Sequence, residues 1–175
     1  MLESHKESEP HKIVLPSGEA VRVPTRHLSF EPWSGPPISD TYGGKAVLDL
    51  NGEPLFPELA ILRLLQREGF DGVWVDTYSH RFRQSMAPEG CKLPPWVQAE
   101  FEKIVGEVGN WSGCWDVLAW KADQIFFVES KRKGKDSVRS SQERWLLAAL
   151  RAGNSADCFL ICEWDFRADH DLKSV

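Results

Sequence analysis

Apolar and polar residues alternate along the chain in blocks that predict helices interleaved with strands. Four short apolar runs rich in β-branched and aromatic residues have the length of strands: "FDGVWVDTY", "CWDVLAW", "IFFVESK" and "DCFLICEW". A helix is predicted before the first run, from about Pro57 to Glu68. Pro57 suits a first helical position, and Gly69 suits the residue just past a helix end.

Two further segments have helical patterns. The stretch "PPWVQAEFEKIVGEVG" is one, and residues 140–151 are the other. Ser140 and Glu143 have the spacing of a capping box, and Gly153 follows the expected end. The order helix, strand, strand, strand, helix, strand predicts an α/β fold with a mixed central β-sheet flanked by helices.

The N-terminal part differs in character. Residues 1 to about 12 are polar and predict a disordered tail, followed by a β-hairpin around Ser17-Gly18 and a Pro/Gly-rich loop over 30–44. Asn51-Gly52 predicts a tight turn between two short strands. We therefore expect an N-terminal extension over 1–45, made of tail, hairpin and loop, and a single domain over 46–175.

Charged residues stand at the end of an otherwise apolar strand. If the turn before that strand consists of residues 122 and 123, antiparallel pairing places Asp116 opposite Glu129; a turn at 123 and 124 places it opposite Lys131. Either register keeps the three side chains on one face, whereas a three-residue turn would put Asp116 on the other face. Side chains directly opposite have Cβ atoms about 4.5–5.5 Å apart.

Two carboxylates this close repel each other, and a divalent cation would relieve the repulsion. Oxygen ligands with open coordination positions suit Mg²⁺ or Mn²⁺, and Lys131 could polarise a water molecule and stabilise an anionic transition state. Glu58 lies on the apolar stripe of the first helix, so it needs a partner and is a candidate for the outer metal shell. Asp76, at the end of the preceding strand, is a reserve ligand.

A basic arm follows the strand. The chain carries a net charge of −5, but the segment from Glu129 to Arg151 is positive. Four basic residues of this arm could bind phosphates or belong to a solvated loop: Arg132, Lys133, Lys135 and Arg139. Gln142 lies in the first turn of the next helix, where anions are favoured. Gly43-Gly44-Lys45 lacks the other residues of a phosphate-binding loop.

The stretch "WDVLAW…FFVESKRKGKDSVRSSQERWLLAAL" resembles the Asp…Glu-x-Lys…Gln core of the PD-(D/E)xK nuclease superfamily, and within it the virus-type replication-repair nuclease (VRR-NUC) domain. The resemblance covers about residues 55–163. It implies a restriction-endonuclease-like core and a Mg²⁺- or Mn²⁺-dependent nuclease acting on DNA, including structured or branched DNA in repair, recombination or defence. Trp115 replaces the Pro that often precedes the first Asp in this superfamily, and the N-terminal 45 residues match nothing in the pattern.

The resemblance also implies roles for individual residues. Asp116, Glu129 and the backbone carbonyl of Ser130 would bind the metal, Glu58 would match the acidic helix, and Lys131 and Gln142 would complete the catalytic set. Stand-alone nucleases of this size are often homodimers. No signal peptide or membrane span is predicted, which favours the cytoplasm.

Two other functions are consistent with the sequence. The first is a nuclease-like module that binds nucleic acid or regulates without cutting, although binding alone needs no pair of metal-binding carboxylates. The second is a scaffold for a protein partner, with an interface made by exposed tryptophans; the candidates are Trp33, Trp74, Trp96 and Trp111.

Overall fold

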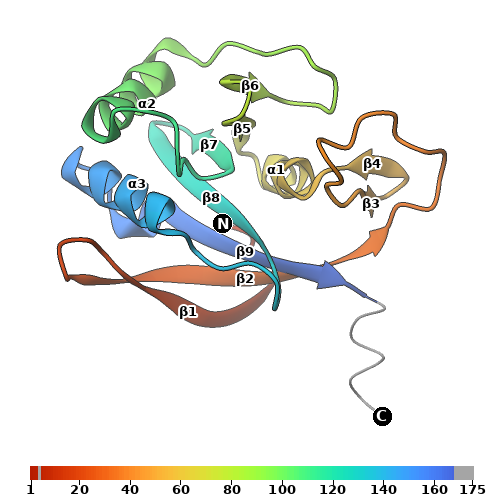
Figure 1. Ribbon diagram of the computed structural model, residues 1–175, viewed down its shortest axis with the longest axis horizontal. Coiled ribbons are helices and arrows are strands. Elements are labelled where there is room, and N and C mark those ends of the chain that lie inside the picture. The colour runs from red at the N-terminus through yellow and green to blue at the C-terminus, as the bar shows by residue number, and fades with distance from the viewer. Residues whose placement is uncertain (4, 168–175) are drawn as a thin grey trace.

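A computed structural model describes residues 1–3 and 5–167 of the chain. In this part of the chain nine strands form one sheet, with three α-helices against it (Figure 1). The strand order is β4-β3-β2-β9-β8-β7-β5-β6, and β1 pairs with β2. The strands are β1 (Lys6–Val14), β2 (Ala20–Pro32), β3 (Leu48–Leu50), β4 (Glu53–Leu55), β5 (Asp71–Asp76), β6 (Arg81–Arg83), β7 (Val117–Lys121), β8 (Gln124–Arg132) and β9 (Phe159–Phe166).

The helices cover the two faces of the sheet. Helix α1 (Pro57–Arg67) lies on one face, and α2 (Pro95–Val108) and α3 (Ser140–Arg151) lie together on the other. Strand β8 shows why: Ile125 and Phe127 point into the core under α2 and α3, whereas Phe126 and Val128 point toward α1. A strand covered on both faces reads as the continuous apolar run seen in the sequence.

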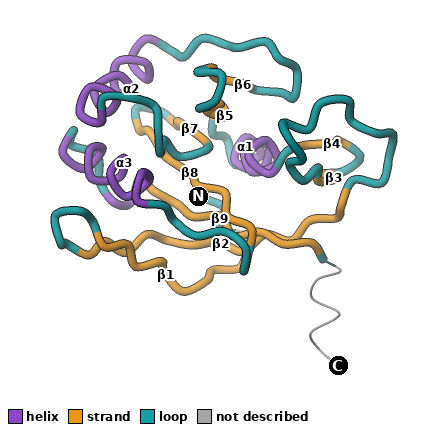
Figure 2. The backbone as a smooth tube through the Cα atoms, in the orientation of Figure 1, coloured by secondary structure: helices purple, strands orange, loops and turns teal. Residues whose placement is uncertain are grey.

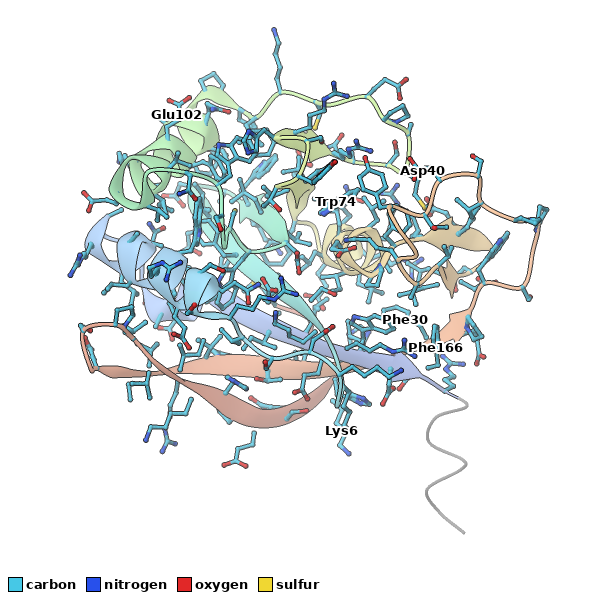
Figure 3. All side chains as sticks on the ribbon, in the orientation of Figure 1. Lys6, Phe30, Asp40, Trp74, Glu102 and Phe166 are labelled. Atoms are coloured by element: carbon cyan, nitrogen blue, oxygen red, sulfur yellow. The ribbon has the colours of Figure 1, made fainter. Side chains whose placement is uncertain are left out.

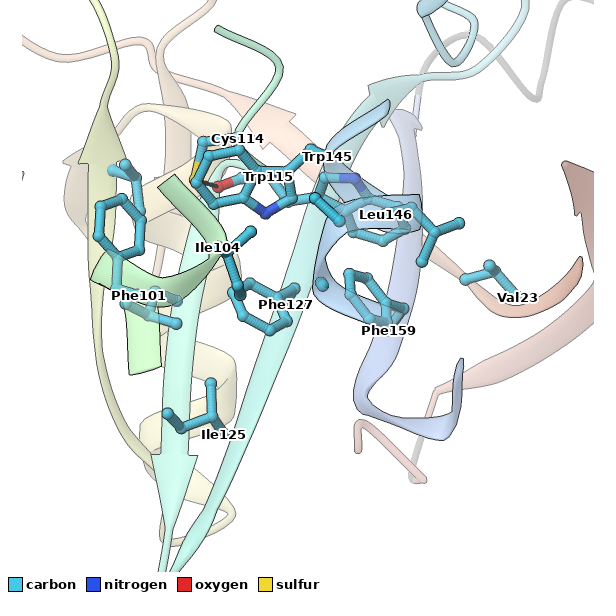
Figure 4. Packing of buried hydrophobic residues seen from close by; sticks show 14 of the residues in the cluster. Val23, Phe101, Ile104, Cys114, Trp115, Ile125, Phe127, Trp145, Leu146 and Phe159 are labelled. Carbon is cyan, nitrogen blue, oxygen red and sulfur yellow. Dashed lines mark hydrogen bonds between the residues drawn. The ribbon is translucent and has the colours of Figure 1, made fainter. Parts of the chain in front are cut away.

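Aromatic side chains fill the core beneath α2 and α3. Phe127 stacks on Phe159 at a centroid distance of 4.9 Å, and Trp115 meets Phe159 edge-on at 4.8 Å (Figure 4). Trp145 of α3 lies 5.5 Å from Phe101 of α2. Burying one such side chain stabilises the fold by about 1.5–3 kcal/mol. This packing fixes α3 against the end of β8, where the charged residues lie.

The sheet is mixed, as predicted. Strands β7 and β8 are antiparallel, whereas β8 pairs in parallel with β9, and β9 with β2. Helix α3 forms the crossover between the parallel strands β8 and β9. The predicted α/β class, the mixed sheet with flanking helices and the N-terminal hairpin are confirmed. The short strand β6 was not predicted, because it consists of Arg81, Phe82 and Arg83 in a stretch that reads as loop.

The first residues are not the expected disordered tail. Residues 6–12 belong to β1, which pairs with β2, and the Leu2 side chain is fully buried. The Leu2 amide donates a hydrogen bond to Glu68 at 2.7 Å. Strand β2 lies inside the sheet, between β1 and β9 (Figure 2). The prediction was wrong because β1 is a largely exposed strand whose polar residues carry no apolar pattern.

The capping residues at the start of α3 also differ from the prediction. Arg139, not Ser140, is the residue before the helix, and its backbone amide donates to Oε1 of Gln142 at 2.9 Å. Gln142 therefore takes the role expected of Glu143. This shift by one residue leaves the Gln142 side chain at the helix start, facing the end of β8.

Candidate functional site

The turn between β7 and β8 decides which residues face each other. Lys121 pairs with Gln124 and Val117 with Val128, so the turn consists of Ala122 and Asp123. One step beyond Val117, the same register places Asp116 opposite Glu129. The first of the two registers left open by the sequence is therefore the correct one.

Asp116 is fixed between two neighbouring strands. Its carbonyl accepts a hydrogen bond from the Val75 amide at 2.8 Å, and its Oδ2 accepts one from the Ser130 amide at 3.0 Å. The side chain is half-buried. The backbone amide of Ser130 thus holds this carboxylate beside the end of β8.

Glu129, Lys131 and Gln142 form one buried network. Each is less than a tenth exposed, and Lys131 Nζ lies 2.8 Å from Glu129 Oε1 and donates to Gln142 Oε1 at 3.0 Å. Gln142 Nε2 donates to the same oxygen of Glu129. The strand period of two brings Glu129 and Lys131 to one face, and the first turn of α3 supplies the amide between them.

Two carboxylate oxygens near this network lack a hydrogen-bond donor. They are Oε2 of Glu129 and Oε2 of Glu58, both buried. The other oxygen of Glu58 pairs with Lys45, which the sequence did not point to. A buried carboxylate oxygen without a donor is costly, and a bound cation would satisfy it. These residues therefore fit a divalent cation.

One cavity of about 430 Å³ joins these groups. It is lined by Lys45, Glu58, Asp116, Glu129, Ser130, Lys131, Arg132, Asp136, Arg139, Gln142 and Trp164, among others. Asp116 also lines two neighbouring cavities, of about 640 and 480 Å³. Trp74 and Asp40, labelled in Figure 3, line the larger one. The hollows on this part of the surface therefore meet at Asp116.

Burial and like charges act on both acids. Burial first, then the charges of Glu129 and Glu58, raise the pKa of Asp116 well above its ordinary value, and Lys45 and the Ser130 amide offset part of this rise. Burial also raises the pKa of Glu129, which the charge of Lys131 and hydrogen bonds hold down. Asp116 and Glu129 are close enough to hydrogen-bond once one of them is protonated. A divalent cation would replace that proton.

The basic arm divides into two parts. Arg132 and Arg139 line the cavity of the acidic residues, and Arg139 also lines the 480 Å³ cavity. The Arg132 guanidinium lies over Trp164 and Phe166, at 5.4 and 5.0 Å from the ring centroids. Lys133 and Lys135 are exposed in the turn that follows β8.

Asp76 has another partner. Its carboxylate lies 3.0 Å from Nε of Arg83, and both side chains are 3% exposed. It also accepts hydrogen bonds from Tyr42 and Ser79. This set of contacts holds the turn that carries Tyr78, a residue that is 93% exposed and lines both cavities beside Asp116. Sequence patterns contain no signal for Tyr78, because its position depends on the pairing of β5 with β6.

The tryptophans give little support to an aromatic interface. Of the four candidates, Trp74 is buried, Trp33 and Trp111 are half-buried, and Trp96 is 41% exposed. Trp111 packs against Phe82 and Phe101, at centroid distances of 4.9 Å. A single exposed ring on α2 makes no extended apolar patch.

Within residues 1–3 and 5–167, no group of three or more His, Cys, Asp and Glu side chains is arranged to hold a metal ion. The candidate donors are accordingly few: the facing carboxylates of Asp116 and Glu129, with the Ser130 carbonyl and Glu58 as the remaining predicted oxygens. None of the helices in the same residues is long and apolar enough to cross a membrane. No model of a known protein family, no characterised protein and no solved structure matches the chain.

Proposed function

We propose that the chain is a metal-dependent nuclease that hydrolyses phosphodiester bonds of DNA. One observation carries the proposal: Asp116 and Glu129 face each other across neighbouring strands, at the rim of a cavity that also holds the Lys131 ammonium. Pairs of carboxylates that bind a cation beside a basic side chain suit the hydrolysis of phosphate esters. The resemblance to the PD-(D/E)xK pattern supports the same reaction.

Asp116 and Glu129 would hold Mg²⁺ or Mn²⁺, with the Ser130 carbonyl as a third donor and Glu58 in the outer shell. A bound divalent ion supplies Lewis-acid polarisation of the phosphate and lowers the pKa of a water ligand. The unpartnered Oε2 of Glu129 supports this assignment, because Oε1 is already engaged by Lys131 and Gln142.

Lys131 has the position expected of a group that acts on the attacking water. Its ammonium bonds to Glu129 and Gln142, which leaves a third hydrogen for a water molecule or a phosphate oxygen. In hydrolysis, an oxygen–phosphorus bond forms from water, which gives up a proton, and the ester bond breaks, with a proton passing to the leaving oxygen; charge builds on the phosphate oxygens in between. A fixed ammonium at this place stabilises that charge.

The substrate strand would follow the cavities that meet at Asp116. Arg139 can neutralise a phosphate next to the reacting one, and the exposed ring of Tyr78 can stack on a base. Stacking on an exposed ring needs a base that is not inside a duplex, which favours single strands, flaps or frayed ends.

Incubation with a panel of labelled DNA structures tests the proposal, with Mg²⁺, with Mn²⁺ and with a chelator. We expect cleavage that requires the metal and that Glu129→Gln abolishes. Lys131→Ala should retain metal binding but cut slowly, since it removes transition-state stabilisation and not a ligand. Binding of DNA with no cleavage under any metal would support the non-catalytic module instead.

A further inference from the structure

Lys45 brings a second positive charge into the site. It follows Gly43 and Gly44, whose φ values of +75° and +96° turn the loop toward α1. Its ammonium pairs with Glu58 and lies 4.9 Å from the Trp74 ring centroid. The side chain is 33% exposed, so one side of it faces the cavity. The loop thus brings in a lysine whose ammonium neutralises the buried Glu58 carboxylate and also reaches the cavity.

The charges in the cavity show what Lys45 changes. The charged residues that line the cavity balance in number: Glu58, Asp116, Glu129 and Asp136 are acidic, and Lys45, Lys131, Arg132 and Arg139 are basic. One bound divalent cation therefore makes the lining net positive, which attracts a phosphate. A second divalent cation would add strong repulsion, because both ammonium groups are already present. Lys45 also engages one Glu58 oxygen that such an ion would need.

We propose that Lys45 takes the place of a second metal ion, so that the site binds one divalent cation and the Lys45 ammonium binds a phosphate oxygen of the nucleic acid. This inference rests on the proposed nuclease function. An ammonium and a phosphate form a charge-assisted hydrogen bond, and Lys acts at such sites as a point charge. One side of the Lys45 ammonium lies against the face of the Trp74 ring, and the other side faces the cavity, where a ligand can reach it.

Substitution of Lys45 should have opposite effects on the binding of Ca²⁺ and of DNA, and measuring both tests the inference. We expect calorimetry with Ca²⁺ to give one ion per chain for the parent. Lys45→Met removes a repelling charge and frees Glu58, so Ca²⁺ should bind about tenfold tighter or a second ion should appear. Fluorescence anisotropy with a labelled single-stranded DNA in Ca²⁺ should show about tenfold weaker binding, since a charge-assisted contact is lost. Lys45→Arg should restore the DNA affinity.

Lys103→Met is the matched control, because this lysine is exposed on α2 and, within the described residues, forms an ion pair only with Glu100. It should change neither measurement. Glu58→Gln offers a second variant that keeps Lys45: it should weaken Ca²⁺ binding and leave DNA binding intact or stronger.

If Lys45 has only a structural role, its substitution should weaken the binding of both Ca²⁺ and DNA. That result, or unchanged binding of both ligands, would overturn the inference. The proposed function fails in a different way. If the parent does not bind Ca²⁺, or if Glu129→Gln binds it as well as the parent does, the carboxylates are not a metal site at all.

Discussion

The backbone amide of Ser130 donates a hydrogen bond to the carboxylate of Asp116 at 3.0 Å, and so ties the start of β7 to the end of β8. This hydrogen bond fixes the Asp116 carboxylate next to Glu129, where the two like charges repel each other. A side chain that is fixed where its charge is unfavourable is typical of a site built for a ligand and not for stability alone.

Asp116→Asn should separate stability from activity. The amide oxygen still accepts from Ser130, but the negative charge is gone. The raised pKa of Asp116 means that its ionised form destabilises the fold at neutral pH, so the variant should melt a few degrees higher in EDTA. Cleavage should fall at least about 100-fold. Addition of Ca²⁺ should raise the melting temperature of the parent only, and a variant stabilised by Ca²⁺ as much as the parent would refute the ligand role.

Arg139→Ala should weaken the binding of single-stranded DNA and flatten its salt dependence, by about 0.7 in the slope of log K against log salt for one lost phosphate contact. Arg139 lines two of the cavities that meet at Asp116, so a short oligonucleotide should already show the effect. The double variant Lys133→Ala, Lys135→Ala is the comparison, because both residues lie outside these cavities. It should affect only an oligonucleotide long enough to reach past them. Equal effects with the short one would show that the arm acts through its total charge.

Tyr78→Ala should lower the affinity for single-stranded DNA about tenfold, which corresponds to the loss of one stacked base. The thermal stability should not change, because the ring is 93% exposed. Tyr78→Phe keeps the ring and should bind as the parent does. Trp96→Ala removes another exposed ring, on helix α2, and is the control for a general loss of surface aromatics. If fluorescence anisotropy shows that the Tyr78→Ala variant binds single-stranded DNA as tightly as the parent does, Tyr78 does not contact the substrate.

Asp76→Asn should destabilise the fold by about 3 kcal/mol at pH 7, since it leaves Arg83 buried without its counter-charge. Burial raises the pKa of Asp76, but its hydrogen bonds with Ser79 and the charge of Arg83 outweigh this, so the pKa lies below its ordinary value. The folded state therefore gains stability from ionised Asp76 at pH values above the unfolded pKa. Urea titrations should show the difference constant above about pH 5 and shrinking below about pH 4, as the carboxylate is protonated.

Asp123→Asn, in the exposed β7–β8 turn, serves as the control and should leave the free energy of unfolding at pH 7 unchanged. If the difference in unfolding free energy between the parent and Asp76→Asn stays constant down to about pH 2.5, the charge of Asp76 contributes nothing to stability beyond the shape of the side chain.

Gly113→Ala should destabilise the fold by about 2–4 kcal/mol. A Cβ at this position would lie 2.2 Å from the Ser141 carbonyl oxygen, and φ is +82°. Gly109 has a similar φ of +86° but open space around it, so Gly109→Ala isolates the cost of the backbone conformation, about 1 kcal/mol. The difference between the two variants in chemical denaturation measures how closely the loop before Asp116 packs on the start of α3. Equal losses would show that the loop can move away.

The acidic pair and its lysine could be predicted because local rules fix them. A strand period of two and a tight turn determine the face of Asp116, Glu129 and Lys131, and helical spacing places Gln142. Lys45 and Tyr78 could not be predicted, because their positions depend on the path of a long loop and on a pairing with the three-residue strand β6. The N-terminal part of β1, residues 6–12, was missed for a related reason: these residues pair by backbone hydrogen bonds and bury few side chains, so hydrophobic periodicity contains no trace of them.

The two-residue turn at Ala122 and Asp123 has a consequence for how this chain tolerates insertions and deletions. The turn is exposed and lies about 20 Å along the strand from Asp116, a place where extra residues usually do little harm. Here, one inserted residue would shift the pairing by one, and either Asp116 or Glu129 would have to point to the opposite face of the sheet. Insertions of two residues preserve the alternation. Insertions of an even number of residues in this turn should therefore leave the site intact, whereas insertions of an odd number should disrupt it. Comparing the two kinds of insertion shows whether function requires Asp116 and Glu129 on the same face of the sheet.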